Sequence, residues 1–213
     1  MVEIERLDAC NLIVKNHSFD HDGLVIHGYG GNKEEMLALA VALAERSHLR
    51  LLVCDLPGHG SFSTKEFTLD NALDALKPAM TTIGRPDFFV GHSVGARLGL
   101  MLGLPIAAAI SPPGEIVFEG GRADLLRVLR ARRVKEVAPF HGLQEVLAAP
   151  VEPAPQTLVL KAAIELKSVN SFVDDWQALG IESSRIAESD HLDIISATQT
   201  HLVVGEWLDR CLS

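Results

Sequence analysis

A serine flanked by two glycines stands near the middle of the chain, in the pentapeptide Gly91-His92-Ser93-Val94-Gly95. An apolar run at 88–90 precedes it, and a helix-compatible run at 96–102 follows. Between a strand and a helix, a G-x-S-x-G sequence lifts the serine hydroxyl above the sheet edge, next to the free N–H groups of the helix start. Such a serine can act as a nucleophile when a neighbouring base removes its proton. An ordinary glycine turn can have the same pattern. Only the rest of the sequence can distinguish such a turn from a nucleophilic serine.

Two further glycine-rich turns follow apolar runs. His27-Gly28-Tyr29-Gly30-Gly31 follows the run at 24–26, and Asp55-Leu56-Pro57-Gly58-His59-Gly60 follows the run at 51–54. The runs alternate with segments of helical spacing, which is typical of a parallel sheet covered by helices on both faces. We expect strands at 2–7, 12–15, 24–26, 51–54, 88–90, 106–110, 157–160 and 184–187, and helices at 33–46, 68–83, 96–102, 168–179 and 198–211.

The alternation of strands and helices is interrupted between residues 111 and 155. Prolines bracket this segment at Pro112-Pro113 and at Pro150, Pro153 and Pro155. Within it, residues 123–137 and 143–148 have the pattern of short helices. An insertion of this kind predicts a lid over the functional edge of the sheet. The chain of 213 residues is therefore expected to be one domain, 1–213, with a lid insertion at about 111–155.

Composition narrows the functional classes. A formal net charge of -9 argues against a general nucleic-acid binder. The N-terminus lacks the apolar core of a secretion signal, and no apolar run reaches the ~18 residues of a membrane span. The three widely spaced cysteines, Cys10, Cys54 and Cys211, are interpreted as reduced thiols, which predicts a cytoplasmic protein. A metal site in the polar turn at 16–23 is conceivable, but a solvated loop explains that turn better.

In their order, the three glycine-rich turns resemble those of the α/β-hydrolase superfamily. The resemblance spans nearly the whole chain and implies an α/β-hydrolase fold, with a mostly parallel sheet, helices on both faces and a short helical lid. It implies that Ser93 is the nucleophile of a nucleophile elbow. It also places the base in the loop after the last strand, where His191 stands, whereas His201 falls inside the predicted last helix.

The acid of the implied catalytic triad is expected after the strand that follows the lid. Glu165 stands there, although Ala162 replaces the glycine that usually begins this turn. A glutamate can hold an imidazole as an aspartate does. Asp174 and Asp175 remain alternatives, while Asp190 is too close to the base in sequence and Ser111 cannot serve as an acid.

The resemblance further implies an oxyanion hole made of two backbone N–H groups, those of Tyr29 and Val94. It implies no cofactor and no metal.

The expected function is a serine hydrolase, esterase-like or thioesterase-like, that cleaves an ester or thioester of a small to medium acyl substrate through an acyl-enzyme. The same triad also suits a carbon–carbon bond hydrolase or a haloperoxidase-like enzyme, and a non-catalytic ligand-binding protein is a third hypothesis. A small-molecule acyl substrate is the expected partner, with no nucleic acid or membrane, and the sequence leaves the oligomeric state open.

Basic residues gather in the predicted lid, among them Arg130, Arg132 and Arg133. A solvated helix face explains these charges without any function. The alternative is an anion-binding surface suited to the phosphates of an acyl thioester carrier.

Overall fold

The chain forms an eight-stranded sheet flanked by helices, in a computed structural model that describes residues 1–114, 134–138 and 140–213. The strands follow the spatial order β1-β2-β4-β3-β5-β6-β7-β8. β1 and β2 pair antiparallel, β2 pairs antiparallel with β4, and every pair from β4 to β8 is parallel. This arrangement confirms the predicted fold class.

The helices and strands have the following bounds. The strands are β1 Val2–Arg6, β2 Asn11–Asn16, β3 His21–Ile26, β4 Leu49–Cys54, β5 Phe88–His92, β6 Ile106–Ile110, β7 Gln156–Ile164 and β8 Glu182–Asp190. The α-helices are α1 Leu37–Ser47, α2 Leu69–Thr82, α3 Val94–Met101, α5 His141–Ala148, α6 Lys167–Ala178 and α7 Thr198–Leu212, and the short 3₁₀ helices are η1 Lys33–Met36, η2 Gly60–Phe62 and η3 Asp193–Ser196.

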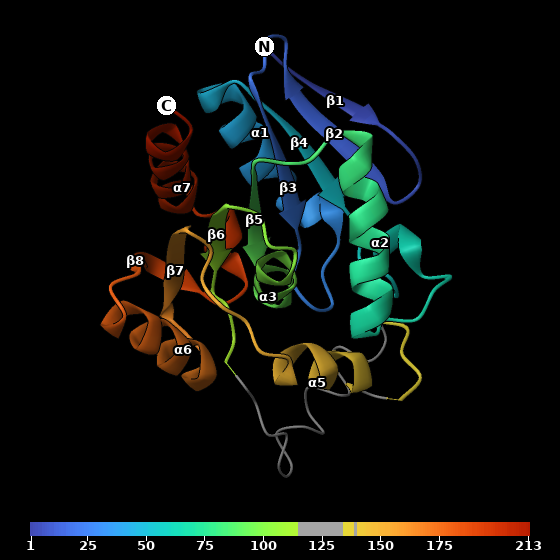
Figure 1. Cartoon of the computed structure of the whole chain (residues 1–213), viewed down its shortest axis with the longest axis vertical. Helices are drawn as coiled ribbons and strands as arrows, with labels where there is room; N and C mark the ends of the chain where they lie inside the picture. Colours follow the sequence, from blue (N-terminus) through green and yellow to red (C-terminus); the bar gives the residue numbers. More distant parts are fainter. Residues whose placement is uncertain (115–133, 139) are drawn as a thin grey trace.

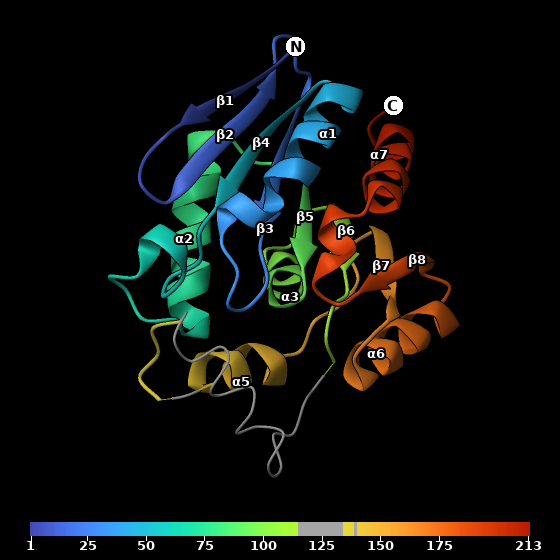
Figure 2. The same cartoon turned by 180° about the vertical axis from the view of Figure 1, so that it is seen from behind.

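Two hydrophobic cores cover the two faces of the sheet. On one face, α1 and α7 bury residues such as Leu43 and Leu208. On the other face, α2, α3, α5 and α6 contribute residues such as Leu76, Leu98 and Val173. The central strands are buried on both sides, which explains their continuous apolar sequences. Figures 1 and 2 show the helices on the two faces, with α5 at the end of the molecule opposite the two termini.

Outside the helix predicted at 123–137, the predicted strands and helices match elements of the structure, but some of their bounds differ. β7 runs on to Ile164 and β8 to Asp190, so Glu165 and His191 follow their strands directly. Of the helix predicted at 123–137, residues 123–133 lie outside the described residues and 134–137 are not helical. There the backbone of Lys135 pairs across the molecule instead, because its N–H donates to Gly58 O and its carbonyl accepts from Phe67 N.

Neither transmembrane character nor a metal cluster is found within the described ranges. No helix in them is long and apolar enough to cross a membrane. No group of three or more histidines, cysteines, aspartates or glutamates in them could hold a metal ion.

The start of α3 packs against the end of β3 with no room for a side chain. A Cβ on Gly95 would lie 2.4 Å from the carbonyl oxygen of His27 and 2.5 Å from that of Ile26. Backbone cannot yield as a flexible side chain can. We expect Gly95→Ala to lower the free energy of unfolding by about 2 kcal/mol, measured by urea denaturation.

Gly205 in α7 provides the matched control. A Cβ there would meet the flexible side chain of Arg46 at 2.6 Å, and alanine is a better helix former than glycine. Gly205→Ala should therefore change the stability by less than about 1 kcal/mol. Equal losses in the two variants would contradict the close backbone approach at Gly95.

Candidate active site

Ser93 lies at the turn between β5 and α3 in a strained backbone conformation. Its φ of 52° and ψ of −119° are rarely adopted by residues other than glycine. A Cβ on Gly91 would lie 2.6 Å from the carbonyl oxygen of Gly95, so glycine is needed where strand and helix approach each other. The strain is of the kind that persists at functional sites. Ser93 is buried but for 7% of its surface.

A chain of hydrogen bonds joins Ser93 to His191 and Glu165. The Nδ1 of His191 lies 2.6 Å from Glu165 Oε1, and its Nε2 lies 3.0 Å from Ser93 Oγ. The Glu165 carboxylate can only accept a hydrogen bond, so Nδ1 of His191 carries the hydrogen that is donated to it. Nε2 of the neutral ring then accepts a hydrogen bond from the Ser93 hydroxyl. The structure thus brings together three residues that the sequence singled out, from the ends of β5, β7 and β8.

Glu165 is held by more than the imidazole. Its Oε2 accepts from Ser111 Oγ at 2.5 Å and from the N–H of Ala162 at 3.3 Å, and its Oε1 also accepts from the N–H of Leu166 at 2.9 Å. Burial would raise the pKa of Glu165, but the hydrogen bond and charge of His191, with the bonds from Ser111 and Leu166, hold it below its usual value. The carboxylate is therefore charged at neutral pH. From the sequence, Ser111 was excluded as an acid, but its role as a hydrogen-bond donor to the Glu165 carboxylate was not predicted.

The alternative acids have other partners. Asp174 lies exposed on α6 and pairs with Lys161 at 2.5 Å, and Asp175 is exposed on the same helix. Asp190 accepts from the N–H groups of Leu192 at 2.8 Å and Asp193 at 3.1 Å. Asp190 therefore shapes the loop that carries His191.

The loop at 28–31 lies against the turn at Ser93, since a Cβ on Gly28 would be 3.2 Å from Ser93 Cβ. The ring of His27 holds this loop in place through two hydrogen bonds. Its Nε2 accepts from the N–H of Leu56 at 3.0 Å, so its Nδ1 carries the proton and donates to Gly28 O at 2.7 Å. That bond holds the peptide plane between Gly28 and Tyr29, and hence the direction of the Tyr29 N–H.

A buried ion pair supports the same loop from its far end. Asp55 Oδ2 accepts from Lys33 Nζ at 2.6 Å and from the N–H of Ser61 at 2.8 Å, and its Oδ1 accepts from the N–H of Lys33 at 2.8 Å. Burial would lower the pKa of Lys33, but the hydrogen bonds with Asp55 and Glu34 raise it above its usual value. The side chain of Asp55 is fully buried and that of Lys33 is 3% exposed, so each charge depends on the other.

Two polar contacts tie the segment between β6 and β7 to the site, and sequence reasoning missed both. Tyr29 donates its hydroxyl to Glu136 Oε2 at 2.6 Å, and the N–H of Phe140 donates to the same oxygen at 2.8 Å. The buried Arg97 of α3 donates to the carbonyls of Val146 and Leu147 in α5, both at 3.0 Å. α5 is thereby held against α3, the helix that begins directly after Ser93. Arg130, Arg132 and Arg133, the predicted anion-binding residues, lie outside the described residues.

The sequence profile of the alpha/beta hydrolase family matches residues 24–207. The chain belongs to the alpha/beta hydrolase family. This membership supports a hydrolase activity. No curated protein matches the chain significantly.

Several solved structures share the alpha/beta hydrolase fold of this chain. Carboxyl esterase 2 from the fungus Tuber melanosporum has a TM-score of 0.67 at 15% identity, over 100% of this chain and 87% of its own. The thioesterase domain from the curacin biosynthetic pathway has a TM-score of 0.64 at 14% identity, over 97% and 98%. A protein proposed to be a non-heme bromoperoxidase, BpoC from Mycobacterium tuberculosis, has a TM-score of 0.67 at 12% identity, over 99% and 96%. Because the identities are low, these likenesses concern the fold alone.

The buried histidine His59 should make the stability depend on pH. Burial and the neighbouring His27 lower the pKa of His59 to about 3. In the unfolded chain His59 binds a proton below about pH 6.5, so folding loses stability as the pH falls from 6.5 toward 3. We expect His59→Leu to remove about 1.4 kcal/mol per pH unit from the slope in this window, measured by urea denaturation at successive pH values.

Phe67→Leu is the control, because Phe67 packs edge-on against His59 and carries no proton. This variant should lower the stability at every pH without altering the slope. An unchanged slope in His59→Leu would show that His59 is protonated in the native state.

Proposed function

We propose that this chain is a serine hydrolase that cleaves a carboxylic ester or thioester of a small to medium acyl substrate through an acyl-enzyme. The observation that carries the proposal is the continuous hydrogen-bonded chain from Glu165 through His191 to Ser93. A buried carboxylate, an imidazole with a fixed tautomer and a serine on a strained turn are the parts that acyl transfer requires. The likeness to an esterase and a thioesterase domain supports the same class of reaction.

In the first half of the proposed reaction, His191 Nε2 takes the proton of Ser93 while Oγ attacks the acyl carbon. The carbonyl π electrons move to oxygen, and the N–H groups of Tyr29 and Val94 stabilise the oxyanion. Val94 is the first residue of α3, so its N–H shares the favourable end of the helix dipole. Preorganised donors of this kind contribute about 3 kcal/mol each in the transition state.

The tetrahedral intermediate then collapses, and the bond to the leaving oxygen or sulfur breaks. His191 gives its proton to that leaving atom, which departs as a neutral alcohol or thiol. Glu165 stabilises the imidazolium between the two proton transfers. Water repeats the sequence at the acyl-enzyme, releasing the acid and restoring the Ser93 hydroxyl.

We expect Ser93→Ala and His191→Ala to remove nearly all turnover, because the first deletes the nucleophile and the second its base. The readout is hydrolysis of p-nitrophenyl esters of increasing acyl length, with circular dichroism and urea denaturation as tests of folding. If either folded variant retained wild-type kcat on an ester that the wild type cleaves, the proposed mechanism would be wrong.

Glu165→Gln tests the acid separately. The amide keeps the shape of the side chain but removes the charge that stabilises the imidazolium, so kcat should fall by about three to four orders of magnitude. Asp174→Asn is the matched control and should retain wild-type turnover, because Asp174 pairs with Lys161 on α6. Unimpaired turnover in Glu165→Gln would show that the carboxylate is not the acid of the reaction.

A further inference from the structure

Ser111 follows β6 directly, between the ends of β5 and β7, and has no exposed surface. The peptide unit between Ile110 and Ser111 joins these two neighbouring parts of the sheet. Its carbonyl accepts from the N–H of Ser93 at 2.8 Å, and its N–H donates to Leu160 O in β7 at 2.7 Å. A single peptide unit therefore connects the backbone of Ser93 with the strand that leads to Glu165.

The backbone of Ser111 has an unusual conformation for a serine. Its φ is 48°, in the left-handed region that glycine adopts without the steric cost of a Cβ. A glycine at this position would allow the same turn at a lower cost, but it would bring no hydroxyl. Because strain of this kind gathers at functional sites, the conformation directs attention to the Ser111 side chain.

The Ser111 hydroxyl donates to the acid of the proposed triad. Its Oγ lies 2.5 Å from Glu165 Oε2, a length typical of a strong bond from a hydroxyl to a carboxylate. The other donor to Oε2 is the N–H of Ala162, which lies 3.3 Å away, longer than a usual N–H···O bond. The Glu165 side chain is 1% exposed. Without the hydroxyl, a buried carboxylate oxygen would keep only this long bond, which is costly.

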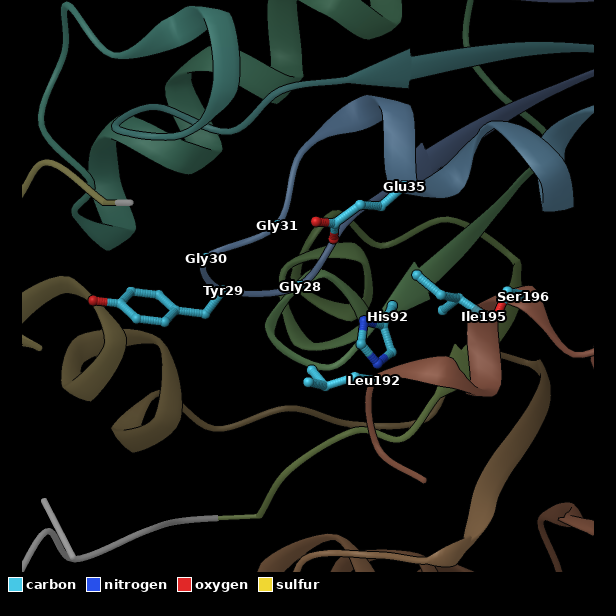
Figure 3. A pocket seen from close by; sticks show the side chains of 9 residues that line it. All are labelled: Gly28, Tyr29, Gly30, Gly31, Glu35, His92, Leu192, Ile195 and Ser196. Carbon is cyan, nitrogen blue, oxygen red and sulfur yellow. The ribbon is translucent and has the colours of Figure 1, made fainter. Parts of the chain in front are cut away.

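The direction of the His191 ring depends on how Glu165 is held. The backbone of His191 is fixed separately, because its carbonyl accepts from His92 Nε2 at 2.8 Å. Figure 3 shows the His92 ring beside Leu192, the residue that follows His191. This bond fixes where the His191 side chain begins. The ring itself is directed by the bond of 2.6 Å between Nδ1 and Glu165 Oε1.

We propose that Ser111 is a positioning residue of the serine hydrolase, whose hydroxyl holds Glu165 with Oε1 toward His191 and stabilises the charged carboxylate. The inference rests on the proposed function. The titratable group that faces Glu165 is His191, from the end of β8. The other donors to Glu165 are uncharged, namely the Ser111 hydroxyl and the N–H groups of Ala162 and Leu166. Loss of the hydroxyl therefore removes a neutral donor and leaves the charges of the site in place.

A purely structural role would also explain a buried serine with a hydrogen bond. In a structural role the activity of variants follows their stability, whereas in a positioning role it follows the hydroxyl. Ser111→Ala and Ser111→Gly separate the two explanations, because both remove the hydroxyl. Alanine keeps the strained Cβ and glycine suits the left-handed conformation, so Ser111→Gly should unfold at a higher urea concentration than Ser111→Ala.

The first experiment measures kcat and KM of these variants on the p-nitrophenyl ester that the wild type cleaves best. We expect kcat to fall by about tenfold in both, because each loses a hydrogen bond to a charged group. KM should change by less than about twofold, since the bond acts on the reaction and not on substrate binding. Wild-type kcat in both variants, or a kcat that follows their order of stability, would overturn the proposal.

Ser189→Ala is the matched control. Ser189 is also a buried serine and stands two residues before His191, but its hydroxyl donates to the backbone carbonyl of Ile186 at 2.9 Å. Its loss should leave kcat at the wild-type value. A fall in kcat equal to that of Ser111→Ala would show that any buried hydroxyl near His191 has this effect, and would overturn the specific role of Ser111.

The second experiment determines whether Ser111 acts through Glu165. In Glu165→Gln the carboxylate charge is already absent, so the hydroxyl has no charged group left to stabilise. Ser111→Ala should then lower kcat by less than about twofold in the Glu165→Gln background, against about tenfold in the wild-type background. Equal factors in the two backgrounds would show that Ser111 acts independently of Glu165 and would overturn the proposal.

A third measurement does not depend on turnover. Burial would raise the pKa of Glu165, but the bonds from His191, Ser111 and Leu166 hold it below its usual value. In Ser111→Ala, Glu165 should therefore bind a proton at a higher pH than in the wild type. The readout is the carboxyl carbon resonance of Glu165 during acid titration of protein labelled in glutamate, assigned by its loss in Glu165→Gln.

The outcomes of this titration separate the role of Ser111 from the proposed function. An unchanged titration of Glu165 in Ser111→Ala would overturn the role of Ser111, even if the wild type cleaves esters. A titration at higher pH in a protein that cleaves no ester would confirm the hydrogen bond and contradict the serine hydrolase function instead.

Discussion

The architecture depends on one backbone constraint, the turn that holds Ser93 at a φ of 52° between β5 and α3. This conformation is tolerated because Gly91 and Gly95 let strand, helix and the end of β3 meet with no intervening side chain. A strained residue of this kind costs about 1 to 3 kcal/mol, which the buried sheet must offset. The same close approach brings the loop at 28–31 against Ser93. The turn at Ser93 and the proposed oxyanion loop are therefore positioned by one packing contact.

Around this turn, the described polar groups are already held in place by the protein. His27 fixes the peptide before Tyr29, Ser111 fixes Glu165, and Glu165 fixes the tautomer of His191. Bonds formed in advance do not have to be reorganised when charge develops in a transition state. The segment between β6 and β7 is held in the same way. Arg97 donates to the carbonyl of Val146 in α5, and Glu136 accepts from the N–H of Phe140 just before this helix. The cost of burying these groups is compensated where each one has a partner.

Much of this arrangement could be predicted from local sequence. The turn at Ser93 depends on neighbouring residues, and the resemblance to the family directed attention to the loop after the last strand, so Ser93 and His191 could be singled out. Glu165 could be expected from its place after β7 even though Ala162 replaces a glycine. The N–H of Ala162 donates to Glu165 Oε2, so this turn forms without glycine. The partners that orient the site could not be predicted, because Ser111 is 54 residues from Glu165 and Tyr29 is 107 residues from Glu136. The end of the predicted helix at 123–137 failed for the same reason, since the backbone of Lys135 pairs with distant residues.

Covalent labelling is the direct test of whether Ser93 is an activated nucleophile. A fluorophosphonate reacts much faster with a serine whose proton a neighbouring base can accept than with an ordinary serine. Intact-mass measurement followed by peptide mapping should find a single adduct, on Ser93, that is absent in Ser93→Ala and forms far more slowly in His191→Ala. No adduct on the folded protein, or an adduct on another serine that persists in Ser93→Ala, would show that Ser93 is not an activated nucleophile.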